Sequence, residues 1–258
     1  MRPFIIGLPI NSKEPMSKPI YATVPITLLK NIHKDQGGTI KQMFDYAVYD
    51  RMVKEFPDID EYDLGIDEIV FSLNYFHLNA NRLESRLQDG KELYHKHKSD
   101  PNTSITIELL LKFQEEKTEF ELMVFSFYCA IRSMIGTKQY FKGTDDYWIL
   151  RAFGYSSNED FEKGITTSQN RDLIGKYSLR YHKDKIKKVL QNEWFLIYYS
   201  NHVRGYYVSF KMDFKSLVNI AEDKKDLFKQ KELLRKQEVQ QVLADRANKK
   251  NHKIKVPF

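Results

Sequence analysis

Acidic and histidine residues stand at spacings that invite metal chemistry, and each set departs from the pattern such a site needs. An acidic run offers oxygen ligands of the kind calcium prefers: Asp58, Asp60, Asp63, Gly65 and Asp67. Tyr62 and Asp63, however, occupy the fifth and sixth positions, where a calcium loop needs a ligand and a glycine. His95 and His97 are two residues apart, so on a helix they point in different directions and make poor co-ligands. We therefore expect no metal site.

Signatures of other enzyme chemistry are equally weak. No GxxxxGK[ST] loop occurs, so a nucleotide-driven motor is not expected. A metal-dependent nuclease would need Asp58 beside a strand that carries Asp89 and Lys91, but residues 81–97 have the pattern of a helix. Cys129 is the single cysteine and lies in an apolar run, which predicts a core residue and a reducing compartment. The sequence predicts a non-enzyme with no catalytic residue, cofactor or metal.

Basic charge, by contrast, is concentrated in two segments. Residues 171–192 carry 7 Lys/Arg against 2 Asp/Glu, and residues 224–258 carry 11 against 4. Residues 41–70 carry the opposite excess, with 3 basic and 9 acidic residues. Such focusing is typical of a protein with one face that meets a polyanion, although solvated surface lysines would give the same counts.

The first basic segment contains a helix pattern over residues 178–192. Its inner stripe consists of Leu179, Ile186, Val189 and Leu190. Two runs rich in aromatic and β-branched residues follow within residues 194–211, joined by the turn residues Asn201 to Gly205. This pattern predicts a β-hairpin directly after the helix.

A helix of this diameter fits the major groove of duplex DNA, where side chains near its N-terminus reach base edges. Arg180 could bridge two acceptors of a guanine, lysines would hold phosphates, and Arg204 at the hairpin tip would touch backbone or minor groove. The residues expected to contact DNA are Arg171, Lys176, Arg180, Tyr181, Lys183, Lys187, His202 and Arg204.

The elements that must position these residues begin at Thr118. Thr118 and Glu121 form a capping-box pattern that opens a buried helix over residues 118–135. A short strand at 139–141, a helix at about 144–153 and a polar connection of some twenty residues lead to the basic helix. This order of elements resembles the winged helix-turn-helix superfamily, which implies DNA binding by the basic helix and a hairpin wing. The long connection departs from that family, where a tight turn is usual.

The sequence of the N-terminal half predicts a proline-rich arm that contains a strand at Ile20–Val24. Helices are predicted after it at 40–56, 67–76, 81–97 and 105–113. The run FDYAVYDR, which begins at Phe44, looks like FSFYCAIR, which begins at Phe125. Chance similarity between amphipathic helices explains this echo better. If it is real, the architecture weakly resembles the tandem winged-helix replication initiators of plasmids and other mobile elements.

The C-terminal segment 224–247 has strong helix propensity but sparse apolar residues, so it is expected to be exposed, to follow phosphates or to pair with another chain. The sequence contains no stretch of about 18 consecutive apolar residues, so no membrane span is predicted, and we expect a cytoplasmic protein. The expected domains are a helical one at 1–100, a winged helix at 101–222, and a basic helix and tail at 223–258.

The expected fold is mainly α (α+β), a helical bundle with a C-terminal winged helix-turn-helix and hairpin wing, followed by a basic helix. The expected function is non-catalytic binding of double-stranded DNA, as in a replication initiator or transcriptional regulator. The alternative is a structural or protein-interaction module whose basic helix binds an acidic partner, with a homodimer among the expected assemblies.

Overall fold

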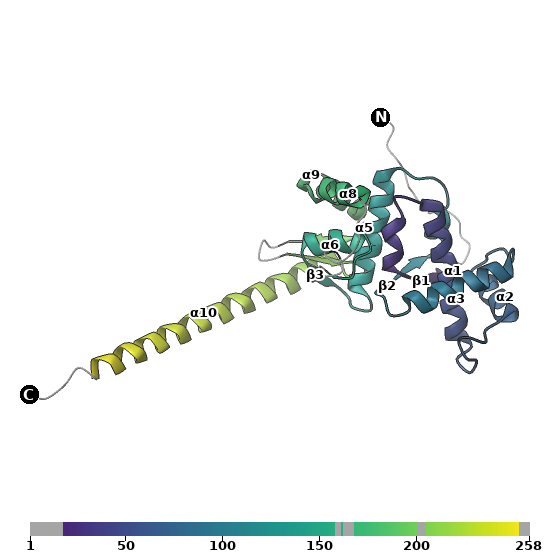
Figure 1. The fold of residues 1–258 in the computed structure, drawn as a ribbon. Coiled ribbons are helices and arrows are strands. Elements are labelled where there is room, and N and C mark those ends of the chain that lie inside the picture. The colour runs from purple at the N-terminus through teal and green to yellow at the C-terminus, as the bar shows by residue number, and fades with distance from the viewer. Residues whose placement is uncertain (1–17, 158–160, 162–167, 201–204, 253–258) are drawn as a thin grey trace, which may run out of the picture.

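The described part of the chain is mainly helical, with two small antiparallel sheets (Figure 1). The structure, a computed structural model, describes residues 18–157, 161, 168–200 and 205–252. Two hydrophobic cores divide most of the described chain into an N-terminal lobe and a C-terminal lobe, and a long helix extends from the second lobe. Within the described residues, no helix has the length and apolar character needed to cross a membrane.

The N-terminal lobe is built from helices around a two-stranded sheet. Its elements are β1 (Tyr21–Pro25), the 3-10 helix η1 (Ile26–Asn31), α1 (Gln36–Glu55), α2 (Ile66–Tyr75), α3 (Leu83–His97), β2 (Asn102–Thr106) and α4 (Ile107–Lys112). α1 begins where the Asp35 side chain accepts a hydrogen bond from the Gly38 amide at 2.9 Å, an N-cap that satisfies one free N–H of the first turn. Helices were expected at 40–56, 67–76 and 81–97, and α1, α2 and α3 confirm them.

Strand β2 was not anticipated. It pairs antiparallel with β1, with Tyr21 opposite Thr106 and Pro25 opposite Asn102. The expected helix at 105–113 is therefore wrong at its start, because the first residues of that range complete a sheet and only α4 is helical. For the same reason the expected boundary at residue 100 divides the N-terminal core, since Ile105, Ile107 and Leu110 are buried in it.

The C-terminal lobe follows in the order α5 (Glu119–Ile135), β3 (Phe141–Gly143), α6 (Asp145–Ala152), α8 (Ser168–Ser178), α9 (Arg180–Glu193), β4 (Ile197–Tyr199) and β5 (Tyr206–Ser209). α5 begins with the expected capping box, in which Thr118 and Glu121 each bond the other's backbone amide. This helix is the wall shared by both cores, because Phe125 and Cys129 face the first while Phe127 faces the second.

The three strands of this lobe form one antiparallel sheet in the order β3-β5-β4. Along β5 the side chains alternate between its two faces, as a strand requires. Tyr206 and Val208 enter the C-terminal core, whereas Tyr207 faces the opposite side and packs with Leu217 and Ala221 of α10 (Phe214–His252). The start of α10 thus covers the outer face of the sheet.

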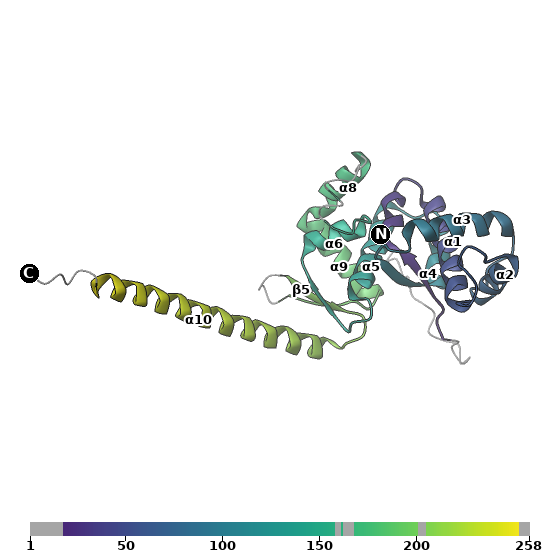
Figure 2. The ribbon, with the colours of Figure 1, turned by 60° about the horizontal axis from the view of Figure 1, so that its bottom comes forward.

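α10 then leads away from both lobes as an isolated helix (Figures 1 and 2). It has 39 residues, so at 1.5 Å per residue it is about 58 Å long. It begins ten residues before the helix expected at 224–247, because Asp213 caps the Ser216 amide at 2.9 Å and Leu217 is buried against the sheet. The prediction of an exposed helix is confirmed for its later turns, where Leu227 and Leu234 are more than half exposed.

The expected polar connection before the basic helix also needs correction, since it contains α8. The sequence of α8 is mostly polar, but Leu173 and Tyr177 are buried in the C-terminal core. Asn170 adds a hydrogen bond of 2.9 Å to the carbonyl of Lys30. Packing on distant elements, more than local sequence preference, therefore makes this segment helical.

Candidate nucleic-acid interface

Helix α9 lies on the C-terminal lobe with one apolar side against α5. Ile186 and Leu190 are fully buried and fix this side in the core. The helix begins at Arg180, two residues later than expected, because α8 runs to Ser178 and Leu179 is extended between the two helices. No side chain caps the N-terminus of α9, and within its first turn the amides of His182 and Lys183 donate to the carbonyl of Leu179 at 3.1 and 3.2 Å.

The outward side of α9 carries exposed polar and charged side chains. The Arg180 side chain is 94% exposed, and Tyr181 is 71% exposed. Lys188 and Gln191 are exposed two and three turns further along the same side. Asp184 lies between them, with its carboxylate 3.5 Å from Nε of Arg180.

Two lysines expected to contact DNA are instead held by one carboxylate of α6. Nζ of Lys183 lies 3.0 Å from Asp145, and Nζ of Lys187 lies 3.1 Å from the other oxygen of the same side chain. Burial by itself would raise the pKa of Asp145, but the adjacent ammonium groups of Lys187 and Lys183 outweigh it, and the pKa is lowered. The two ion pairs of Asp145 thus hold α9 against the first turn of α6.

Lys187 is the more enclosed of the two, at 9% exposure. Its ammonium group lies 4.8 Å from the ring centre of Tyr198, 5.7 Å from that of Tyr206 and 5.8 Å from that of Trp148. The Tyr198 hydroxyl is within 3.3 Å. Aromatic faces attract a cation, so this lysine joins α9 to α6, β4 and β5. The structure corrects its expected role, because a buried and paired ammonium group fixes the helix on the sheet and is not presented to a partner.

On α8, Lys176 is also paired. Its ammonium group lies 2.7 Å from Glu119, and the Tyr177 hydroxyl donates to the same carboxylate at 2.9 Å. The hydrogen bond from Lys176 is the main reason that the pKa of Glu119 is lowered, with Tyr177 adding to it against the effect of burial. Arg171, by contrast, is exposed.

The net positive charge around residues 171–192 is therefore smaller in the folded protein than the surplus counted from the sequence. Residues 171–192 carry 7 basic and 2 acidic residues, a surplus of +5. Glu119 and Asp145 lie outside this range but pair with three of its lysines, so the local balance becomes 7 against 4, or +3. The exposed cations that remain are Arg171, Arg180, Lys185 and Lys188. Lys185 also lies 4.5 Å above the ring of Phe120.

The hairpin after α9 is present as strands β4 and β5. Gly205 begins the return strand with φ of +107°, and a Cβ there would lie 2.2 Å from the carbonyl oxygen of Gly143. Glycine is therefore required at position 205, just before β5 pairs with β3. His202 and Arg204, expected at the hairpin tip, lie outside the described residues.

Sequence reasoning missed Asp145 as the residue that holds two lysines, and it passed over Lys188 and Gln191. Helical spacing was a usable signal for the last two, because Lys188 lies seven residues after Tyr181 and Gln191 seven after Asp184. The ion pairs of Asp145 join residues 38 and 42 positions apart, and no local pattern marks them.

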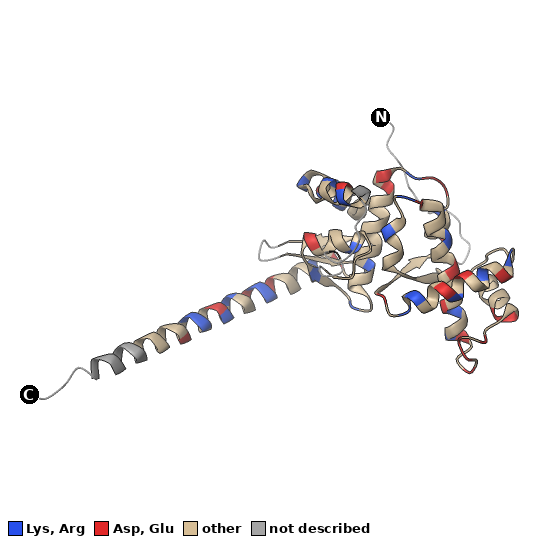
Figure 3. Ribbon diagram, viewed as in Figure 1, with Lys and Arg blue, Asp and Glu red and all other residues tan. Residues whose placement is uncertain are grey.

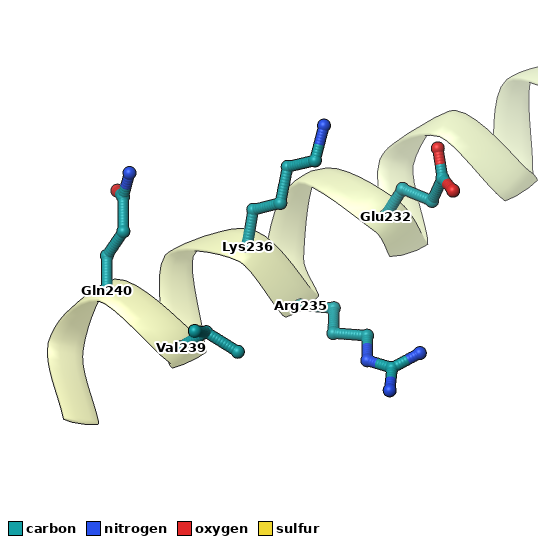
Figure 4. Close-up of a pocket in the computed structure, with 5 residues that line it drawn as sticks. All are labelled: Glu232, Arg235, Lys236, Val239 and Gln240. Atoms are coloured by element: carbon teal, nitrogen blue, oxygen red, sulfur yellow. The ribbon is translucent and has the colours of Figure 1, made fainter. Parts of the chain in front are cut away.

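Two features of the described part of the chain bear on ligands other than nucleic acid. Within those residues, no group of three His, Cys, Asp or Glu side chains could hold a metal ion. A hollow on α10 is lined by Glu232, Arg235, Lys236, Val239 and Gln240 (Figure 4). All five side chains come from one helix, so the hollow has a single wall and encloses nothing.

Comparison of the chain with family models, curated proteins and solved structures finds no match.

Proposed function

We propose that the protein is a non-catalytic DNA-binding protein, of the kind that acts in replication initiation or transcription regulation, and that α9 enters the major groove. The observation that carries the proposal is the outward side of α9, where Arg180 and Tyr181 are largely exposed at the start of a helix that continues into a hairpin. That helix is also anchored on its inner side by Ile186 and Leu190.

The topology supports a winged helix. The order of elements in that fold is matched by α5, β3, α6, α9, β4 and β5. The wing hairpin of that fold pairs its second strand with the first strand of the domain, and the sheet order β3-β5-β4 has this arrangement. α8 is then an insertion between α6 and α9. In this family the second or third helix enters the groove, and the hairpin touches the adjacent backbone.

The side chains on α9 suit direct reading of bases. Arg180 can donate two hydrogen bonds to O6 and N7 of guanine, and Gln191 can pair with the edge of adenine. Lys188 and Arg171 are placed to hold phosphates, which fix the register of the helix without reading sequence. With a local surplus of only +3, we expect moderate phosphate-driven affinity and a larger share from base contacts.

Fluorescence anisotropy with labelled duplex DNA tests the proposal. We expect binding at about 50 mM salt that weakens steeply as salt rises, because each neutralised phosphate contributes a slope of about −0.9 in log K against log salt. Replacing Arg180→Ala together with Lys188→Ala should weaken binding by at least about 10-fold and make the salt slope shallower by about 1–2.

The matched control removes two exposed cations of the N-terminal lobe, Lys96→Ala with Lys112→Ala. This variant should retain the affinity and salt slope of the parent protein. Equal losses in both double variants would mean that general positive charge, and not α9, determines binding. No duplex binding at about 50 mM salt would overturn the proposal.

A further inference from the structure

An acidic surface with exposed apolar side chains lies on the N-terminal lobe, around the turn between α1 and α2. Residues 55–81 contain seven Asp/Glu and no Lys or Arg. We call the acidic face the exposed residues Asp58, Ile59, Asp60, Tyr62, Asp63, Ile66, Asp67 and Phe71. Tyr62 is 57% exposed and Phe71 44%, so bulky apolar area stands among the carboxylates.

Cations close to this face already have partners, and Lys91 donates to the backbone carbonyl of Tyr62 at 2.6 Å. Arg51 pairs with Glu55 at 2.6 Å, and Lys98 pairs with Glu61 at 2.6 Å. None of the four aspartates of the acidic face has an ion pair with any residue that the structure describes. The face therefore presents four carboxylates to solvent, and their summed negative potential attracts a cationic partner.

A surface of complementary character lies on α10. Leu227, Lys231 and Leu234 succeed one another at spacings of four and three residues, so they share one side of the helix. Both leucines are more than half exposed, at 56% and 58%. Residues 224–244 carry six Lys/Arg against three Asp/Glu, and blue and red segments alternate along this helix in Figure 3.

The two surfaces belong to opposite ends of the chain. α2 lies at the far end of the N-terminal lobe, whereas α10 leads outward from the C-terminal lobe in both views (Figures 1 and 2). A straight helix that points away cannot fold back on the acidic face of its own chain. Contact between the two surfaces therefore requires two molecules.

We propose that the acidic face of one copy binds the exposed part of α10, residues 224–244, of a second copy. Lys231 and Arg235 of the incoming helix meet the aspartates, while Leu227 and Leu234 cover Phe71, which shares one side of α2 with Asp67. The two surfaces differ, so the contact is head-to-tail, and every bound copy still offers one free surface of each kind. The protein then forms open chains whose length grows with concentration, and along DNA this arrangement makes binding cooperative.

Sedimentation equilibrium of the full-length protein without DNA tests the assembly separately from DNA binding. We expect the weight-average mass to rise beyond the dimer with concentration at about 50 mM salt and to return to the monomer at about 0.5 M, where the screening length is near 4 Å. A mass that stays monomeric at about 50 mM salt across the accessible concentrations overturns the proposal.

Charge reversal identifies the two surfaces. The face variant carries Asp60→Lys, Asp63→Lys and Asp67→Lys, and the helix variant carries Lys231→Glu, Arg235→Glu and Lys236→Glu. Each variant alone should associate at least about 10-fold more weakly than the parent, because like charges now oppose each other. The mixture of both should associate again, since reversed face meets reversed helix and native face meets native helix.

The matched control reverses three exposed glutamates elsewhere, Glu108→Lys, Glu115→Lys and Glu116→Lys, and should associate like the parent. A further variant, Leu227→Ser with Leu234→Ser, changes only exposed side chains of the isolated helix and should also weaken association. Assembly that stops at the dimer and is unaffected in the face variant would show α10 pairing with α10, and this result contradicts the proposal.

Discussion

Replacement of Asp145 by asparagine tests the arrangement that holds α9 on its lobe. Asp145 accepts from Lys183 and Lys187, whose side chains are only 15% and 11% exposed. Asparagine keeps the size of the side chain but removes its charge. Two mostly buried ammonium groups then lose their counter-ion, and Lys187 keeps the aromatic rings around it and the Tyr198 hydroxyl.

The magnitude follows from how far the pair is buried. Breaking a fully buried ion pair costs about 3–5 kcal/mol, while an exposed pair contributes about 0–1 kcal/mol. The Asp145 side chain is 31% exposed, between these limits, so we expect a loss of about 2 kcal/mol in the free energy of unfolding. With a urea slope of about 3 kcal/mol per M, the unfolding midpoint falls by about 0.7 M.

Urea unfolding followed by circular dichroism measures this loss, and the neighbouring residue supplies the control. Asp146 is exposed in the same first turn of α6, so Asp146→Asn removes an equal charge from the same helix N-terminus. It should change the midpoint by much less. Equal midpoints for the two variants would refute the assignment of Asp145 as the anchor of α9.

The loss should also depend on pH. The pKa of Asp145 is lower in the folded chain than in the unfolded one, so its stabilisation is complete above the unfolded value of about 3.9 and is lost as pH falls through the folded value. The difference between the parent and Asp145→Asn should therefore be constant near neutral pH and shrink below about pH 4. A difference that persists unchanged in acid contradicts an ionic origin.

Three further outcomes are expected. Gly205→Ala places a Cβ against Gly143 at positive φ and should destabilise by about 1–3 kcal/mol, measured by urea unfolding, whereas an unchanged midpoint would show that the hairpin can shift. Burial lowers the pKa of His33 to about 4, so stability should fall as pH drops from about 6.5 to 4, and His33→Phe should remove this dependence. Cys129 is fully buried and burial raises the pKa of its thiol, so a thiol reagent should label it only after unfolding, and rapid labelling of the native protein would contradict this.

Local sequence patterns predicted the helices whose ends and faces are self-contained. α5 was predicted because Thr118 and Glu121 cap it and its apolar residues repeat with the helical period. The junction of α9 with its hairpin was predicted because a basic amphipathic helix is followed at once by two β-rich runs and Gly205. In these places the information lies within a few residues of the element that it determines.

The parts that were missed depend on residues far apart in the chain. β2 is a strand because β1 offers it a partner 77 to 85 residues earlier, from Pro25 opposite Asn102 to Tyr21 opposite Thr106, and its own sequence Asn-Thr-Ser-Ile-Thr is mostly polar. α8 is helical because Leu173 and Tyr177 fit the C-terminal core. The sequence of β2 does not reveal its pairing with β1, and the sequence of α8 does not reveal its packing on the C-terminal core.

The candidate site was mispredicted where charge was counted without partners. Lys187 stands at a position that helical spacing alone leaves ambiguous, and its burial depends on Asp145 and on three aromatic rings from α6, β4 and β5. A buried cation needs such partners, and they come from parts of the chain that only the fold assembles. Arg180 and Tyr181, at the free end of the helix, were predicted correctly to be exposed.

The central claim, that α9 faces DNA, is tested most directly by position-specific crosslinking. A photoreactive benzophenone side chain placed at Tyr181 would replace an aromatic ring that is 71% exposed, and the same group at Lys96 on α3 serves as the control. Irradiation with duplex DNA at about 50 mM salt, where phosphate-driven affinity is high, should give a covalent protein–DNA adduct from position 181 and not from position 96. An adduct from position 96 alone, or equal adducts from both, would contradict the placement of α9 against DNA.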